Sequence, residues 1–224
     1  LGQAPSFEAA KESIARYRDP EVVDAALDAL KAAWASTLDR QQVRTPDEAM
    51  NAMVNVHNPR QCIVTLNWSR YLSRYQVGLG ARGIGFRDSS QDAMGASALA
   101  PEEARAMIEK LLQVQRRDGS AMHQFYPLTM EGSIGDATEG EERPSYYGDD
   151  HLWVILAIAA YLKETGDLAF LDDTLPFYEK DEVGAPLETG TVLEHMERAL
   201  SFTQEHVGDH GLPLLGYADW NDTV

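Results

Sequence analysis

The segment DHLWVILAIAAYLKETG occupies residues 150–166 and decides the fold class. Its apolar run, from Leu152 to Leu162, predicts the most hydrophobic helix of the chain. Because the run is apolar almost all round, we expect this helix to be buried on most sides. Gly166 is expected to end it, since glycine readily adopts the left-handed conformation found after the last helical turn.

Start signals for further helices lie on both sides of this segment. Asp19 followed by Pro20 predicts a capping residue and a first helical position, and Pro101 predicts another start. Thr45 is expected to cap a helix that begins at Pro46, with an apolar stripe that includes Met50 and Met53. Two further residues, Thr191 and Glu194, form a capping box ahead of the last helical pattern.

Strand signals are weak, and the best of them, residues 62–66, is equally compatible with a helix. Long loops, at residues 78–88 and 120–149, separate the helical patterns, and long structured loops are usually functional. We therefore predict an all-α fold, an α/α toroid with its active loops at one end. Residues 1–45 are predicted to be a helical linker, and residues 46–224 the N-terminal part of the barrel.

The composition excludes several classes of partner. The chain has 224 residues and a net charge of −17, so nucleic acid and anionic membrane surfaces are disfavoured. A local positive site is still possible, because arginines cluster at positions 70, 74, 82 and 87. Cys62 is the only cysteine and is expected to fill core space. Without an evident signal peptide or membrane-spanning stretch, we expect a cytoplasmic protein.

Polar groups on a glycine-rich segment, residues 81–92, suggest a binding site for a polyol. Arg82, Asp88, Gln91 and Asp92 offer paired donors and acceptors, and the glycines allow close approach to a ligand. The pattern lacks the features of a dinucleotide or phosphate-binding loop. The structural alternative is that Asp88 caps a helix and Arg87 pairs with an acid.

Two other motifs each allow a structural explanation. In residues 67–70, Trp68 and Arg70 could stack on and bind a ligand, or could be a core tryptophan beside an ion-paired arginine. In residues 149–153, the adjacent acids and His151 could bind a metal ion. We favour acids that complement the dipole of a helix, and predict no metal.

The run Ala218-Asp219-Trp220-Asn221-Asp222 combines an indole with two acids near the end of the chain. An indole offers a flat apolar surface to a sugar ring, and a carboxyl beside it tends to keep its proton, as a general acid must. The alternative is an Asx turn with Trp220 plugging the core. Since no helix or strand follows, we expect the chain to be part of a longer one.

Taken together, these motifs resemble those of the glycoside hydrolase family 94 phosphorylases, the cellobiose phosphorylase group. The resemblance covers the chain from about Met50 to its end and rests on residues 67–70, 83–92, 123–125, 149–153 and 218–222. It implies an (α/α)6 barrel and inverting phosphorolysis of a β-linked glucosyl disaccharide, giving α-glucose 1-phosphate. It also implies that Asp222 is the proton donor and that Arg70, Arg82, Asp88 and Trp220 bind the glucosyl unit.

The same resemblance implies no cofactor beyond phosphate as co-substrate, and a homodimer. The family's phosphate contacts lie mainly in later segments, so the chain alone is expected to be inactive. Cellobiose-type substrates are favoured, with cellobionic acid, chitobiose or laminaribiose as other acceptor types. Two other functions stay open: an inverting hydrolase on the same toroid, and a saccharide-binding module without turnover.

Overall fold

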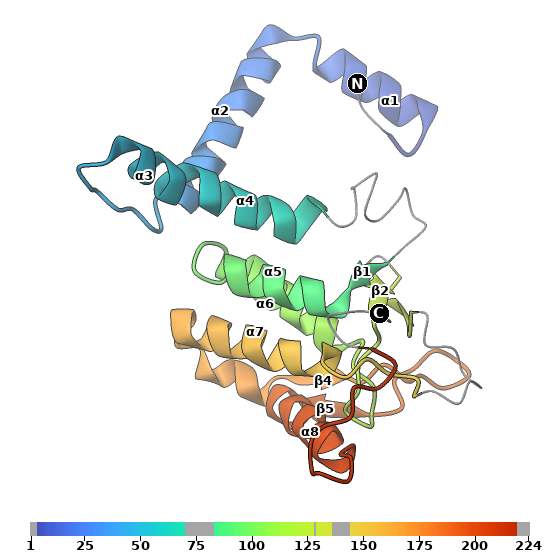
Figure 1. The fold of residues 1–224 in the computed structure, drawn as a ribbon. Coiled ribbons are helices and arrows are strands. Elements are labelled where there is room, and N and C mark those ends of the chain that lie inside the picture. Colours follow the sequence, from blue (N-terminus) through green and yellow to red (C-terminus); the bar gives the residue numbers. More distant parts are fainter. Residues whose placement is uncertain (1–3, 70–82, 128, 136–143, 219–224) are drawn as a thin grey trace. The chain divides into compact units, whose positions relative to one another are not determined.

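A computed structural model describes residues 4–69, 83–127, 129–135 and 144–218. The chain divides into two compact units, residues 1–56 and 57–224. Both are built mainly from helices, and the second also contains short strands that the sequence did not predict (Figure 1). The predicted boundary near residue 45 stays a prediction.

The first unit consists of short helices with well-defined starts. They are α1 (Phe7–Arg16), α2 (Pro20–Leu38) and α3 (Glu48–Ala52), after which the wide-turned helix η1 (Met53–His57) crosses the chain boundary between the units. Asp19 caps α2 as predicted, by accepting a hydrogen bond from the backbone nitrogen of Glu21. The prediction for Thr45 was wrong: Asp47 caps α3, and Thr45 instead accepts from the nitrogen of Asp47.

Two asparagines hold the extended segment ahead of α3. The side-chain amide of Asn51 exchanges two hydrogen bonds with the backbone of Thr45, at 2.8 and 2.9 Å. That of Asn55 does the same with Val43, at 2.8 Å in both directions. The amides thus stand in for the backbone of a neighbouring strand. Every peptide group they contact is satisfied without a sheet.

The apolar residues of the first unit are mostly exposed. Met50 and Met53 are about half exposed, so the stripe predicted for this segment is not buried. No helix in the described part of this unit buries a residue. Cys62, in the second unit, is half-buried and lies outside the core.

The second unit is organised around three helices. It contains α4 (Asn58–Val64), the wide-turned helix η2 (Thr65–Ser69), α5 (Phe86–Ala96), α6 (Pro101–Leu112), α7 (Asp150–Thr165), the 3₁₀ helix η3 (Leu168–Asp172) and α8 (Val192–Glu205). Figure 1 shows α5, α6 and α7 alongside one another, and each packs on the other two. Their contacts form a core that includes Phe86, Ala93, Ile108, Leu111, Leu112, Val154 and Ile158.

The predicted ends of these helices are largely confirmed. Pro101 occupies the first turn of α6, Gly166 ends α7 at φ 70°, and Thr191 and Glu194 form the capping box of α8. The expectation that α7 is buried on most sides was only partly right. One side carries Val154 and Ile158, which are buried, whereas Leu156 is 48% exposed.

Short antiparallel strands lie beside the helices. β1 (Ile84–Gly85), β2 (Gln124–Tyr126) and β3 (Glu131–Ser133) form one sheet in that order, with Ile84 opposite Phe125. β4 (Thr174–Pro176) and β5 (Thr189–Thr191) form a second sheet. Phe125 is fully buried, and it joins the first sheet to the helical core.

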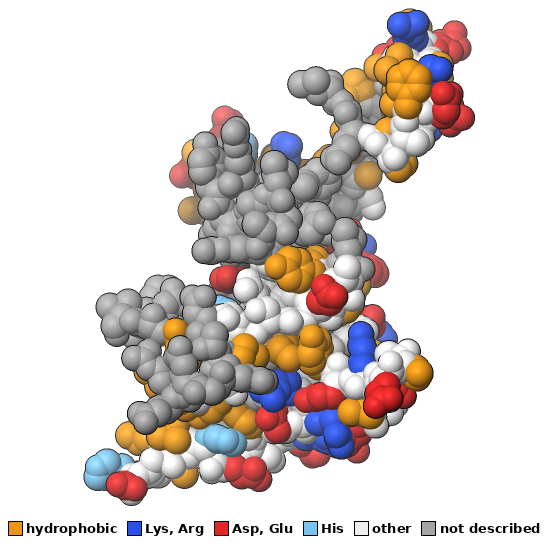
Figure 2. Space-filling view, turned by 90° about the vertical axis from the view of Figure 1, so that its right-hand side faces the viewer, with side chains coloured by type: hydrophobic (Ala, Val, Ile, Leu, Met, Phe, Trp, Pro, Cys, Tyr) orange, Lys and Arg blue, Asp and Glu red, His pale blue; other side chains and the backbone are white. Residues whose placement is uncertain are grey.

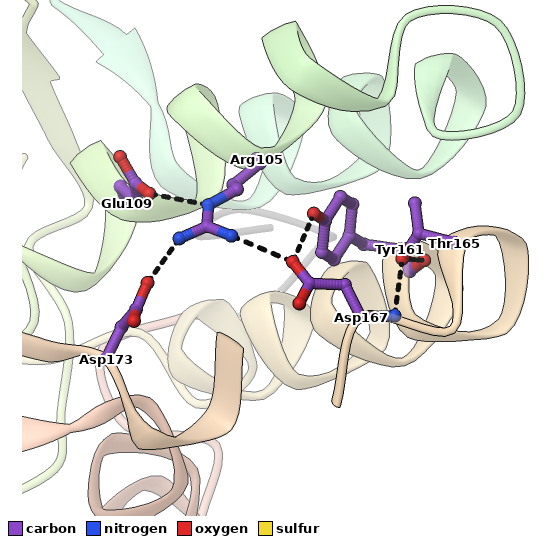
Figure 3. Close-up of polar contacts among 6 residues, drawn as sticks. All are labelled: Arg105, Glu109, Tyr161, Thr165, Asp167 and Asp173. Atoms are coloured by element: carbon purple, nitrogen blue, oxygen red, sulfur yellow. Dashed lines mark hydrogen bonds and ion pairs between the residues drawn. The ribbon is translucent and has the colours of Figure 1, made fainter. Parts of the chain in front are cut away.

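A single arginine ties α6 to the segment that follows α7 (Figure 3). Arg105 donates to Glu109 on its own helix (2.9 Å), to Asp167 (2.8 Å) and to Asp173. The hydroxyl of Tyr161 on α7 donates to the same oxygen of Asp167 at 2.8 Å. The fork geometry of a guanidinium suits this role, since it offers several donors in one plane.

Acidic and basic side chains also lie side by side on the ungreyed surface of the second unit in Figure 2, despite the net charge of −17. Glu188, for example, pairs with both Arg117 and Arg198. Among the described residues, no helix is long and apolar enough to cross a membrane.

Two histidines are buried on or beside α8. His195 bonds through Nδ1 to the side-chain oxygen of Gln115 (2.7 Å) and stacks on Phe177, with ring centres 3.9 Å apart. His151 on α7 bonds through Nε2 to the hydroxyl of Thr203 (2.6 Å). Burial lowers the pKa of each histidine from 6.5 to about 4.

These histidines predict acid sensitivity. Between pH 6.5 and about 4 the unfolded chain binds protons that the folded chain does not, so stability is fully present above pH 6.5 and falls as the pH drops. Each histidine contributes on the order of 3 kcal/mol to this loss. Urea unfolding at pH 7.5, 6 and 5 measures it. His195→Asn keeps a donor at the Nδ1 position and should give a shallower pH dependence than the wild type. An unchanged slope would contradict the assignment.

Candidate active site

The glycine-rich segment forms the start of α5 and packs against β2. Strand β1 pairs with β2, and the backbone nitrogen of Phe86 donates to the carbonyl oxygen of His123 at 2.9 Å. A Cβ atom at Gly83 would lie 2.6 Å from the carbonyl oxygen of Phe125. Glycine is therefore required at this position by the close approach of two backbones. Whether the neighbouring glycines also admit a ligand stays a prediction.

Asp88 lies in the first turn of α5 and is half-buried. Its carboxylate lies beside Gly85, because a Cβ atom added there would be 2.7 Å from Asp88 Oδ2. Gly85 itself occupies the capping position, so the alternative in which Asp88 caps the helix is wrong. The carboxylate instead sits next to the positive end of the helix dipole, which stabilises its charge.

Arg87 reaches across to the start of α7. Its Nη1 lies 3.4 Å from both carboxylate oxygens of Asp149, and the indole nitrogen of Trp153 donates to Asp149 Oδ2 at 2.9 Å. The structural alternative for Arg87, pairing with an acid, is thus confirmed. These contacts join the N-terminal ends of α5 and α7, which bear two of the predicted motifs.

Asp150, the next residue, binds a different partner, His123. Its Oδ2 lies 2.8 Å from His123 Nδ1, and Asp150 is only 1% exposed. The other oxygen, Oδ1, is buried with no hydrogen-bond partner among the described residues. Burial raises the pKa of Asp150, while the hydrogen bond from His123 opposes that shift. The two adjacent acids therefore serve separate contacts.

Tyr147 stacks on the ring of His123. The rings of His123 and Tyr147 are 3.6 Å apart and inclined by 13°. The backbone of Gly135 closes over their edges, since a Cβ atom there would lie 2.7 Å from His123 Cδ2 and 3.0 Å from the hydroxyl of Tyr147. The stacked rings are consequently held on several sides by tight packing.

The chain returns to this place just before the Trp220 motif. Residues 216–218 pair with residues 146–148: the nitrogen of Tyr217 donates to Tyr146 (2.8 Å), and that of Gly148 donates to Ala218 (2.9 Å). Gly216 has φ +71°, and a Cβ atom on it would lie 2.5 Å from the carbonyl oxygen of Tyr146. Ala218 is fully buried. The approach to the motif is thus fixed up to its first residue.

Of the predicted site residues, the structure describes one, Asp88. Arg70, Arg82, Trp220 and Asp222 lie outside the described residues. Two described segments that lead to these motifs are linked, one at Gly83 and one ending at Ala218. Gly83, which follows Arg82, packs against β2, and β2 is linked through His123 and Tyr147 to the segment that ends at Ala218.

Sequence reasoning missed the contacts that bring these segments together. His123 and Asp150 lie in the motifs at residues 123–125 and 149–153, but their contact with each other and the stacking of Tyr147 were not predicted. A possible signal was the set of polar and aromatic residues in the long loop before α7. The sequence around Gly216 gave no comparable signal. Glycine is needed there because the backbone of Tyr146, 70 residues earlier in the chain, lies too close for a side chain.

Comparison with known proteins gives a family match over most of the chain. Residues 33–224 match the family model described as "Glycosyl hydrolase 94 superfamily, catalytic domain". The chain belongs to this family. The match includes every segment that converges here, so the contacts described above lie within a family 94 catalytic domain.

Curated relatives include several phosphorylases. The chain is 32% identical to an N,N'-diacetylchitobiose phosphorylase of Vibrio furnissii, covering 94% of this chain and 27% of the relative. It is 30% identical to a solabiose phosphorylase of Paenibacillus borealis, covering 100% and 25%. It is 26% identical to a cellobionic acid phosphorylase of Neurospora crassa, covering 81% and 20%. The chain thus spans about a quarter of the length of the first two relatives.

Proposed function

We propose that the whole protein containing this chain cleaves a β-linked glucosyl disaccharide with inorganic phosphate, giving α-glucose 1-phosphate and the released sugar. Family membership and the phosphorylase relatives support disaccharide phosphorolysis. The observation that carries the proposal is the convergence of the motif segments. The segment that leads to Asp222 is paired to residues 146–148, just ahead of α7. Asp149, which occupies the capping position of α7, contacts Arg87 at the start of α5, where Asp88 lies.

The proposed reaction needs one acid and one nucleophile. A phosphate oxygen attacks the anomeric carbon from the face opposite the leaving sugar, and the bond to the glycosidic oxygen breaks. The leaving oxygen keeps that electron pair and receives the proton of Asp222. An inverting hydrolase also needs a base to activate water, whereas phosphate is already an anionic nucleophile. One carboxylic acid is therefore sufficient here.

The other site residues are proposed to hold the glucosyl unit. Arg82 and Asp88 would bond its hydroxyls, and these hydrogen bonds strengthen as positive charge develops on the ring. Trp220 would offer an apolar face to the sugar, and Arg70 further donors. No metal or cofactor takes part in the proposed reaction. A complete (α/α)6 barrel, a homodimer and a cytoplasmic location belong to the same proposal.

The acceptor sugar is proposed as a class. Cellobiose-type β-1,4 disaccharides are favoured, and cellobionic acid is an alternative. The charged segment at residues 129–143 is proposed to tune this choice. The relatives named for chitobiose, solabiose and cellobionic acid define the panel of substrates to test.

The deciding experiment incubates the whole protein with each disaccharide, with and without phosphate, and measures sugar 1-phosphate and free sugar. We expect turnover only with phosphate, and equal amounts of the two products. Release of two free sugars without phosphate would instead support the hydrolase. Sugar binding without turnover, unchanged in Asp222→Asn, would support the binding module.

A further inference from the structure

We propose that Asp150 and His123 are positioning residues for the proton donor Asp222, acting through Tyr147 and the paired segment 216–218. The inference rests on the proposed function. It concerns two side chains that are not among the residues assigned to the sugar. It follows from three contacts, each made by described residues.

The first contact fixes the histidine ring. Asp150 is the first residue of α7, which packs in the core, so its carboxylate has a rigid base. The side chain of His123 is 23% exposed, so packing encloses most but not all of its ring. The 2.8 Å bond from Nδ1 to Oδ2 sets the plane of the ring. A carboxylate that orients an imidazole in this way is a common supporting device in active sites.

Burying the Asp150 carboxylate costs free energy, which indicates a role beyond packing. Asp150 is almost fully buried, and only one of its oxygens has a partner among the described residues. Removing such a group from water is unfavourable, and an apolar residue of similar size is often as stable or more stable at a buried site. Stability alone would therefore favour a different residue here.

The second and third contacts connect the ring of His123 to residues 216–218. Tyr147 lies flat on the oriented ring, 3.6 Å away, and its backbone is bridged to Gly216. Residues 217 and 218 are held by hydrogen bonds to residues 146 and 148, the chain neighbours of Tyr147. Ala218 precedes Asp222 by four residues in the chain. A shift of the Tyr147 ring is therefore passed to the backbone from which the donor extends.

Misplacing a catalytic group by about 1 Å can lower a rate by about 100-fold. We expect Asp150→Leu, which removes the bond to His123, to lower kcat on the disaccharide by about 10- to 100-fold with KM changed less than about threefold. Asp150→Asn keeps an oxygen that can accept from Nδ1. It should stay within about fivefold of the wild type.

A second substrate separates positioning of the acid from loss of structure. β-Glucosyl fluoride, supplied with phosphate, has a leaving group that needs little protonation, so a misplaced acid matters little. Asp150→Leu should retain turnover of the fluoride within about threefold, as should Asp222→Asn. Equal losses on both substrates, or no loss on either, would overturn the inference.

The matched control is Gln115→Leu. Gln115 bonds a histidine that stacks on an aromatic ring, as Asp150 does, but the pair lies between α6 and α8, away from residues 216–218. This variant should lower the unfolding midpoint and leave the ratio of the two kcat values unchanged. A changed ratio would also count against the inference.

The same experiment distinguishes the two proposals. If turnover proceeds without phosphate, the proposed function fails, while the ratio of rates on disaccharide and fluoride still tests the positioning role. If turnover requires phosphate but Asp150→Leu leaves the ratio unchanged, the positioning inference fails alone. If the whole protein turns over neither substrate, both fail.

Discussion

Asp222→Asn in the whole protein should lower kcat on its disaccharide by about 10²- to 10⁴-fold, the usual contribution of a general acid. Asparagine keeps the shape of the side chain and cannot deliver the proton. KM should change little, because the proton is transferred only as the glycosidic bond breaks. Steady-state phosphorolysis of the best disaccharide, with sugar 1-phosphate as readout, measures the effect.

Asp209→Asn provides the control for Asp222. Asp209 is an exposed acid in the same stretch of chain ahead of Ala218, and its replacement should leave kcat unchanged. Near-normal rates for Asp222→Asn would remove this residue from the acid role. The Asx-turn interpretation of the loop would then be preferred.

Gly216→Ala should lower both stability and turnover. The residue has φ +71°, and the new Cβ atom would lie 2.5 Å from the carbonyl oxygen of Tyr146. The left-handed conformation costs about 1–2 kcal/mol for alanine, and the clash adds about 1–3 kcal/mol. Because the clash also pushes residues 216–218 away from their partners, we expect kcat to fall more than tenfold.

Gly211→Ala separates the cost of the left-handed conformation from the cost of the clash. Gly211 has φ +70°, and a Cβ atom on it would meet no described atom within 4 Å. Its replacement should therefore cost only the conformational term and should leave kcat unchanged. Thermal unfolding and disaccharide kinetics, run on both variants, test this. Equal losses of stability would show that the contact with Tyr146 is not decisive.

Local features were predictable from the sequence because they depend on neighbouring residues. Asp19, Pro101, Gly166 and the box of Thr191 and Glu194 act within one helical turn, and each was confirmed. At Thr45 the same rules gave the wrong residue. The free backbone nitrogens at the start of α3 donate to the side chain of Asp47 instead.

Features that depend on distant residues were not predictable. β1 is two residues long and exists because Ile84 meets Phe125, which no pattern around residue 84 indicates. The motifs of the site were found, and Asp88 lies where α5 begins. The link from Asp150 to His123 joins residues 27 positions apart, so it required the fold. Likewise, Leu156 is apolar yet exposed, since burial depends on what packs against that side.

The pairing of Asn51 and Asn55 with the extended segment at residues 43–45 has a built-in limit. Four residues of α-helix advance about 6.0 Å, whereas two residues of strand advance about 6.6 Å. The step from Asn51 to Asn55 runs from α3 into the wide-turned η1, which advances less per residue than an α-helix. The two repeats therefore differ by about 0.6 Å or more per step, so two pairs of hydrogen bonds fit but a longer series would drift out of reach. Such an arrangement can specify one spacing between a helix and the chain before it, and a single inserted residue between positions 45 and 51 would put both amides out of register.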